Sequence, residues 1–77
     1  MKVGDCVTVH SLPDWVSTSP QESRQVFEYC LGRTYLISSI EDDLYVLDVS
    51  VDIDEIFGGL YNDIRLEAEY LTLATCP

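Results

Sequence analysis

Basic residues are scarce in this chain of 77 amino acids. Four Lys and Arg residues face fourteen Asp and Glu residues, which gives a formal net charge of −10 at neutral pH. Such a surface repels the phosphate backbone of nucleic acids and attracts basic surfaces. We therefore expect no direct binding to nucleic acid, and we expect any protein or peptide partner to present a basic surface.

The acidic excess is unevenly distributed. Residues 1–38 contain four acids and three bases, a net charge of −1, whereas residues 39–77 contain ten acids and one base, a net charge of −9. Recognition that depends on charge is therefore expected to involve the second half of the chain.

Long apolar runs are also absent. No run approaches the roughly 20 residues that a membrane-spanning helix needs. The first residues lack the apolar stretch of a secretory signal and pass directly into strand-like sequence. Hydrophobic residues make up 47% and charged residues 23% of the chain, as in ordinary globular domains. We expect a single soluble, cytoplasmic domain over residues 1–77 that makes no contact with membranes.

The three cysteines, Cys6, Cys30 and Cys76, are widely separated in the sequence. An odd number without C-x-x-C spacing indicates neither a disulfide framework nor a zinc site. Cys6 and Cys30 are expected to be small buried hydrophobic residues in a reducing compartment, and Cys76 an exposed thiol on a loose tail.

Catalytic motifs are missing as well. The sequence contains no phosphate-binding loop, no G-x-S-x-G and no H-E-x-x-H. His10 is the only histidine. On a strand its Cα atom would lie about 13 Å from that of Cys6, which is too far for a nucleophile and its base. We expect a protein that is not an enzyme and that holds no cofactor and no metal.

Five segments alternate between apolar and polar residues or are rich in β-branched and aromatic residues, which predicts strands. These segments are residues 2–10, 34–40, 44–50, 61–66 and 71–73. In the first strand, Val3, Val7 and Val9 are expected on one face. The short acidic connector at 41–43 predicts a hairpin, and residues 67–70 predict a 3₁₀ turn before the last strand.

One short helix is predicted over residues 20–31. Ser19 to Glu22 have the pattern of a capping box with Pro at the first helical position. Gly32 follows where a left-handed residue ends many helices. The preceding residues 11–19 are expected to form a loop, with Trp15 and Val16 as its large apolar side chains.

This order of elements, together with Ile-Arg-Leu-Glu-Ala-Glu-Tyr-Leu-Thr-Leu at residues 64–73, resembles the close of an SH3-type barrel. The opening Val-Gly-Asp-Cys-Val-Thr-Val at residues 3–9 resembles the G-D-x-V-x-V first strand of bacterial SH3-like and KOW-type barrels. Residues 30–35 and 62–65 are similar to a small family of bacterial hypothetical proteins without known activity. The resemblance implies a mainly β fold, a five-stranded SH3-like barrel with one short α-helix inserted in the loop after strand 1.

The chain departs from signalling SH3 domains in two respects. It lacks their Ala-Leu-Tyr-Asp-Tyr-like first strand and their tandem Trp, and only Tyr70 matches a position of their peptide groove. The resemblance therefore does not imply binding to proline-rich peptides.

Two sets of residues are candidates for a partner-binding site. The densest group of carboxylates comprises Asp48, Asp52, Asp54 and Glu55, which lack the spacing of a calcium loop. They can form a solvated acidic edge, a weak site for a divalent cation, or a docking surface for a basic partner. Trp15 and Tyr70 are the best candidates for an aromatic surface beside acids, suited to a cationic or peptide ligand.

Three functions remain open. The first is a small acidic, non-catalytic binding module for a protein or peptide. The second is an inhibitor that mimics nucleic acid, antitoxin-like, which binds a basic protein. The third is a subunit of an assembly, paired through a barrel edge or through the apolar residues of segment 53–60. We expect a monomer or a weak homodimer.

Overall fold

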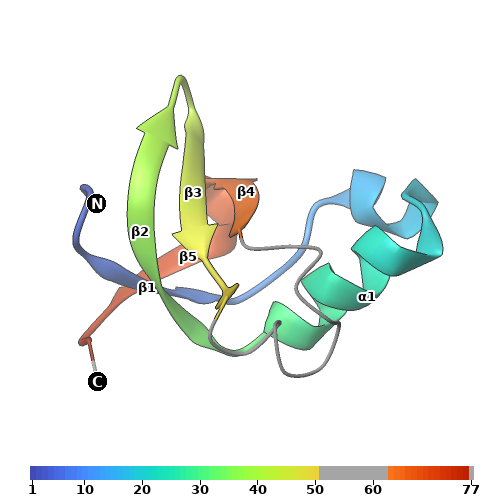
Figure 1. The fold of residues 1–77 in the computed structure, drawn as a ribbon, viewed down its shortest axis with the longest axis horizontal. Helices are drawn as coiled ribbons and strands as arrows, with labels where there is room; N and C mark the ends of the chain where they lie inside the picture. The colour runs from blue at the N-terminus through green and yellow to red at the C-terminus, as the bar shows by residue number, and fades with distance from the viewer. Residues whose placement is uncertain (51–62, 77) are drawn as a thin grey trace.

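The computed structural model describes residues 1–50 and 63–76, which form one antiparallel sheet and one α-helix (Figure 1). The strands are β1 (Cys6–Val9), β2 (Thr34–Glu41), β3 (Leu44–Asp48), β4 (Asp63–Glu67) and β5 (Leu71–Ala74), in the spatial order β4-β3-β2-β1-β5. The helices are η1 (Asp14–Thr18), α1 (Gln21–Cys30) and η2 (Ala68–Tyr70), of which η1 and η2 are 3₁₀ helices. The predicted mainly β fold with a helix after the first strand is confirmed. Among the described residues β4 and β5 stand at opposite edges, so the sheet is open.

The longest described helix, α1, has ten residues. In the part of the chain that the structure describes, no helix combines the length and hydrophobicity that crossing a membrane requires. The apolar part of segment 53–60 lies outside the described residues.

The predicted hairpin is confirmed. Glu41 pairs with Leu44, so β2 and β3 are joined by the two-residue turn Asp42-Asp43. Asp42 has φ 54°, a left-handed conformation that Asp tolerates because its short side chain bonds locally. The register shifts between Ile37 and Ser39, where the sheet accommodates one extra residue.

The core consists of alternate strand residues, as the period of two predicts. Side chains with no exposed surface come from four strands and from the end of the helix; they include Val7, Val9, Ile37, Leu47, Leu66 and Cys30. Val26 of α1 joins the same cluster. Burial of each large side chain contributes about 1.5–3 kcal/mol, so α1 is attached to the sheet by its inner face.

The predicted capping box is wrong. Pro20 occupies the N-cap position without any side-chain hydrogen bond to the helix. Ser19 Oγ donates instead to the Trp15 carbonyl oxygen, 2.9 Å away. The reason is that residues 14–18 form η1 rather than a plain loop, and the carbonyls of Asp14 and Trp15 accept from the nearby hydroxyl groups.

The predicted helix end is confirmed. Gly32 has φ 83° and its N–H donates to the Val9 carbonyl at 2.7 Å, while Val9 N–H donates to the Arg33 carbonyl at 3.1 Å. Arg33 Nε also donates to the Tyr29 carbonyl at 3.1 Å, and its guanidinium lies 4.2 Å from the centre of the Tyr29 ring. The end of α1 is thereby tied to the end of β1.

The first strand is shorter than predicted and Val3 does not belong to its buried face. Val3 is 56% exposed, because the chain turns at Gly4, which has φ 96°. Gly4 N–H donates to the Ile37 carbonyl at 3.0 Å, and Ile37 N–H donates to the Asp5 carbonyl at 2.9 Å. The chain therefore bends at Gly4 and Asp5, and β1 begins after this bend.

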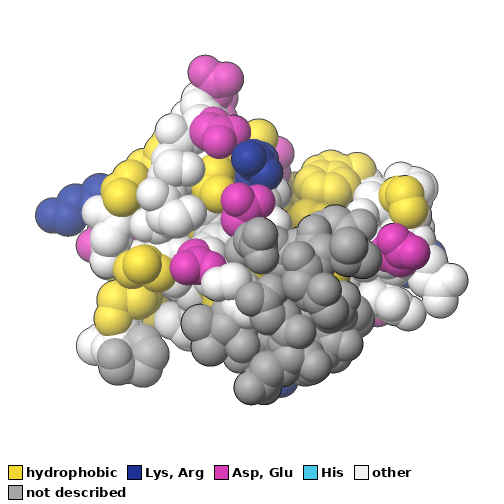
Figure 2. Space-filling view, viewed as in Figure 1, with side chains coloured by type: hydrophobic (Ala, Val, Ile, Leu, Met, Phe, Trp, Pro, Cys, Tyr) yellow, Lys and Arg dark blue, Asp and Glu magenta, His cyan; other side chains and the backbone are white. Residues whose placement is uncertain are grey.

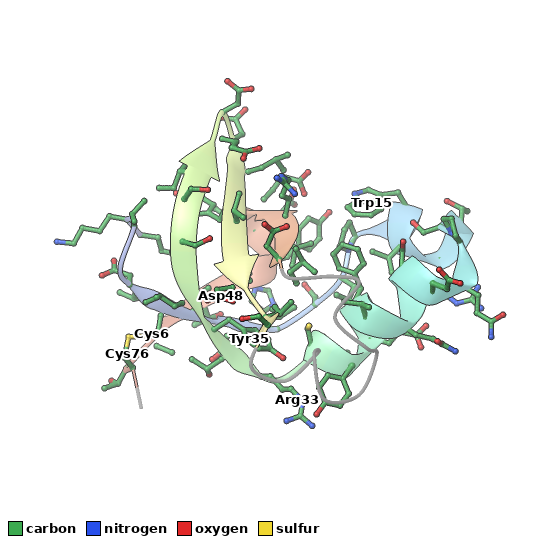
Figure 3. The ribbon with its side chains drawn as sticks, in the orientation of Figure 1. Cys6, Trp15, Arg33, Tyr35, Asp48 and Cys76 are labelled. Carbon is green, nitrogen blue, oxygen red and sulfur yellow. A yellow bond between two sulfur atoms is a disulfide. The ribbon has the colours of Figure 1, made fainter. Side chains whose placement is uncertain are left out.

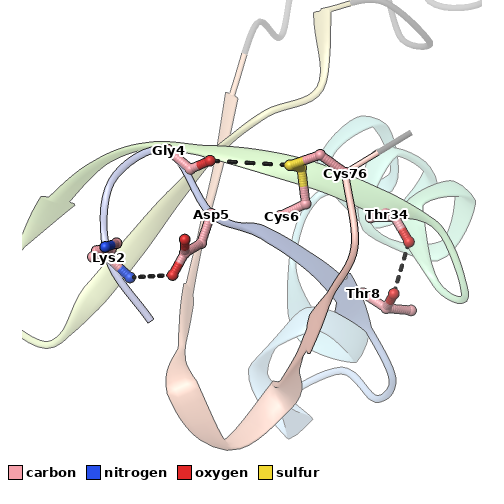
Figure 4. The surroundings of a disulfide bond; sticks show 7 residues. All are labelled: Lys2, Gly4, Asp5, Cys6, Thr8, Thr34 and Cys76. Carbon is pink, nitrogen blue, oxygen red and sulfur yellow. Dashed lines mark hydrogen bonds between the residues drawn. A yellow bond between two sulfur atoms is a disulfide. The ribbon is translucent and has the colours of Figure 1, made fainter.

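A disulfide joins Cys6 to Cys76 (Figure 4). The two Cα atoms are 5.2 Å apart although 70 positions separate them in the sequence. Cys6 pairs in register with Ala74, so the antiparallel course of β5 brings Cys76 close to β1. Cys6 and Cys30 are buried, as expected. The expectation that Cys6 has a free thiol and that Cys76 is an exposed thiol on a loose tail is wrong, because the two are bonded.

We predict that replacing both bonded cysteines, Cys6→Ser with Cys76→Ser, lowers the free energy of unfolding by about 2–4 kcal/mol, because the bond closes a long loop in the unfolded chain. Urea unfolding without reductant measures the difference. Wild-type protein in excess reductant is the matched control and should show the same loss. Equal stability of the variant and the oxidised wild type would contradict a stabilising role.

Candidate functional site

An apolar pocket of about 250 Å³ opens between η1, α1 and β4. Its lining residues are Trp15, Ser23, Val26, Phe27, Asp63, Ile64 and Arg65. Pockets that hold drug-sized ligands measure about 300–1,000 Å³. This pocket therefore has room for one large side chain rather than for a cofactor.

Trp15 forms the exposed wall of the pocket (Figure 3). Its neighbour Val16 is buried in the core, which directs Trp15 outward and leaves it 46% exposed. The Trp15 ring meets Phe27 of α1 edge to face, with ring centres 5.2 Å apart, an arrangement that aromatic pairs favour. Two hydroxyls, from Thr18 and Ser19, donate to the Trp15 carbonyl and hold its backbone in place.

The polar rim of the pocket is an ion-paired arginine. Arg65 donates from Nε and Nη2 to the Glu41 carboxylate, at 3.0 and 3.4 Å, and from Nη1 to Asp63 at 3.2 Å. The hydrogen bond to Glu41 raises the pKa of the Arg65 guanidinium above its ordinary value, and the charges of Glu41 and Asp63 raise it further. With its charge already matched by two carboxylates, Arg65 does not make the pocket an anion site.

Asp48 lies at the end of β3 and serves a local turn. Its Oδ1 accepts from the Ser50 N–H at 3.1 Å and from the Ser50 hydroxyl at 2.7 Å. It does not line the Trp15 pocket, and Figure 3 shows the two labelled residues in different parts of the molecule.

The other predicted members of the acidic cluster, Asp52, Asp54 and Glu55, lie outside the described residues. Within residues 1–50 and 63–76, no group of three or more His, Cys, Asp or Glu side chains could hold a metal ion. The acidic docking surface stays a prediction.

Tyr70 lies in η2, half-buried against the core. Its carbonyl accepts from the His10 N–H at 3.0 Å. Burial raises the pKa of the Tyr70 hydroxyl above its ordinary value, and the charges of Glu69 and Glu67 raise it further. The charge of Asp14 also raises the pKa of Tyr70.

Tyr70 does not line the Trp15 pocket. The two aromatic candidates therefore do not share this pocket. Figure 2 shows the surroundings on one face: exposed hydrophobic side chains lie beside the helices, and Asp and Glu side chains are spread over the sheet.

Sequence analysis missed Phe27, Ile64 and Arg65 as members of a site. Phe27 lies within the predicted helix, and in the structure it is half-buried and shared between the core and the pocket. One signal was present: Arg65 is the only base among ten acids in residues 39–77, and it alternates with Ile64 and Leu66, which point into the core.

The prediction that Cys6 and His10 lie on one strand, too far apart for a nucleophile and its base, assumed a free Cys6 thiol and a strand that includes His10. Cys6 is bonded to Cys76, and β1 ends at Val9, one residue before His10. Cys6 therefore carries no thiol that could act as a nucleophile in this state.

The Trp15 pocket is thus the candidate site, a side-chain-sized hollow with two aromatic walls and a charge-matched rim. Comparisons of the sequence with protein-family models, with curated proteins and with solved structures found no match.

Proposed function

We propose that the protein is a non-catalytic binding module that holds a protein or peptide partner by one large apolar side chain inserted beside Trp15. The observation that carries the proposal is a tryptophan left 46% exposed next to an apolar hollow of about 250 Å³. Binding energy concentrates on such well-packed aromatic sites, with Trp enriched among them. The net charge of −10 favours a partner with basic residues around its apolar anchor.

The chemistry of the pocket supports a binding rather than an enzymatic role. Most of its walls are hydrocarbon, from Trp15, Val26, Phe27 and Ile64. Its charged members, Asp63 and Arg65, are bonded to each other. A general base must lie within hydrogen-bond reach of the proton that it removes from a bound substrate, and the lining offers hydrocarbon and an ion pair instead.

We also propose that the sheet curls as in an SH3-like barrel and that the whole chain is one such domain. The support is the order of elements, with a long helix-containing connection after β1, the β2–β3 hairpin, and η2 directly before β5. The bacterial family resemblance belongs to the same proposal, as does a monomeric or weakly dimeric state.

A cytoplasmic location is likewise a proposal. Disulfides in the cytosol of ordinary cells are usually transient or redox-sensing. In that compartment the bond between Cys6 and Cys76 would open and close, and the sheet would have to persist with both thiols reduced.

A second candidate function is mimicry of nucleic acid by an inhibitor of a basic protein. The observation that favours it is that all three arginines bind partners within the protein. Arg24 pairs with Glu28 at 3.7 Å, Arg33 stacks on Tyr29 and Arg65 bonds to two carboxylates. The positive charges are therefore matched locally, and the excess of acids gives the protein a negative electrostatic potential.

The binding proposal makes a prediction about Trp15. Selection from a display library of random peptides should enrich peptides that carry one large apolar residue next to Lys or Arg. Trp15→Ala should weaken binding of an enriched peptide by at least about tenfold, as expected for an anchor, and Trp15→Phe should restore part of it. Affinities are measured by fluorescence anisotropy of labelled peptide.

Leu31→Ala is the matched control for Trp15→Ala, since Leu31 is 47% exposed and lies outside the pocket. It should bind like wild type. Equal losses for both variants, or peptides that bind without any large apolar residue, would contradict the pocket as the anchor site.

The second prediction separates the two functions by salt. Between about 0.03 M and about 0.3 M salt, a complex anchored by an apolar side chain should weaken only a few-fold, whereas a complex of a nucleic-acid mimic should weaken by orders of magnitude. The same peptide, and any basic protein captured from lysate, are titrated at both concentrations. If affinity falls steeply as salt rises, and the double variant Asp42→Asn with Asp43→Asn shows a smaller fall, the result would favour the mimic over the binding module.

A further inference from the structure

The two cysteines of the disulfide differ in their exposure to solvent. Cys6 is 4% exposed and lies between two strands, in register with Leu36 of β2 on one side and Ala74 of β5 on the other. Cys76 lies beyond the end of β5 and is exposed. Figure 4 shows Cys76 at the end of the chain above β1.

We propose that Cys76 is a thiol-exchange site, the sulfur at which an external thiol opens the Cys6–Cys76 bond, and that the bond acts as a reversible latch on β5. A thiolate must reach the sulfur that it attacks, so access selects between the two ends of a disulfide. Neighbouring strands flank Cys6 on both sides, whereas Cys76 lies beyond the last residue of β5 and is exposed. The site lies on β1 and β5, and the proposal does not depend on the Trp15 pocket.

The exchange balances with a dithiol as reductant. One thiolate of the dithiol attacks Cys76 Sγ, the bond to Cys6 Sγ breaks, and the electron pair passes to Cys6, which takes up a proton from water. The second thiolate of the dithiol attacks the mixed disulfide and displaces Cys76 as a thiolate. The protein has then gained two electrons, and the dithiol has become an internal disulfide.

A hydrogen-bond acceptor lies close to Cys76 and is available to its thiol in the reduced state. Its sulfur lies 4.0 Å from the Gly4 carbonyl oxygen. A disulfide sulfur carries no hydrogen, so in the oxidised protein this is only a contact. A reduced Cys76 carries an S–H group that can donate to the same oxygen.

The two ends of β5 are held by different means. At the start of the strand, Leu71 is 6% exposed and packs in the core, and Tyr70 bonds to His10 through its carbonyl. Near the other end, Leu73 is 60% exposed. In the described part of the sheet β5 pairs with β1 alone, so opening the disulfide should free the end of β5 while its start stays in place.

The first test determines which sulfur is attacked. Oxidised, folded protein is mixed with glutathione, quenched in acid at short times, alkylated and digested with trypsin. Cleavage after Lys and Arg places each cysteine on a separate peptide: residues 3–24 for Cys6, 25–33 for Cys30 and 66–77 for Cys76. We expect at least tenfold more glutathione on 66–77 than on 3–24, with peptide 25–33 unlabelled because Cys30 is buried. Equal labelling, an excess on 3–24, or labelling of all three peptides only after denaturation would overturn the proposal.

The second test examines the latch. Hydrogen exchange is compared between oxidised protein and protein reduced with dithiothreitol. On reduction, the exchange of amides in residues 72–74 is expected to accelerate at least tenfold more than that of β3 amides, whose acceleration reports the lower stability of the whole fold. Equal acceleration throughout the sheet would mean that the bond acts only on the whole fold, and no change in β5 would mean that it latches nothing; either result overturns the proposal.

Discussion

The pairing of β1 with two partners at once is the constraint on which the rest of the structure depends. β1 has four residues, yet it joins β2 on one side and β5 on the other. Val7 and Val9 have no exposed surface, and the backbone of Val9 also binds the end of α1 through Gly32 and Arg33. Both ends of the chain and the only described α-helix therefore meet at this strand (Figure 1).

The candidate site follows from this arrangement. Gly32 holds the end of α1 against β1, and the hydrogen bond of Ser19 to Trp15 joins η1 to the start of α1. Because Val26 enters the core, the adjacent Phe27 is left to pack against Trp15. The pocket lies where η1 and α1 meet the first residues of β4, Asp63 to Arg65.

Local patterns were sufficient to predict the elements of the sheet. In β4, Ile64 and Leu66 alternate with Arg65, which predicts one buried and one exposed face, and the structure confirms it. Gly32 was predicted as the helix end because a left-handed residue there favours glycine, and Asp42-Asp43 was predicted within a hairpin connector. These features depend on neighbours that are close in sequence.

The missed features depend on contacts between distant residues. Cys6 and Cys76 meet only because β5 runs back along β1, which spacing in the sequence does not reveal. The Ser19 hydroxyl could bond to the start of α1 or to η1, and in the structure it donates to the Trp15 carbonyl of η1. The pocket combines η1, α1 and β4, so none of these segments shows it alone.

The most direct measurement for the binding account is a titration of isotopically labelled protein with an apolar, basic peptide, followed by amide and indole chemical shifts. The account predicts the largest changes at the Trp15 indole and at Phe27, Ile64 and Arg65, with the edge of β5 unaffected. Changes confined to β5, to Tyr70 or to the Asp42-Asp43 turn would contradict it and would place the binding surface elsewhere on the sheet.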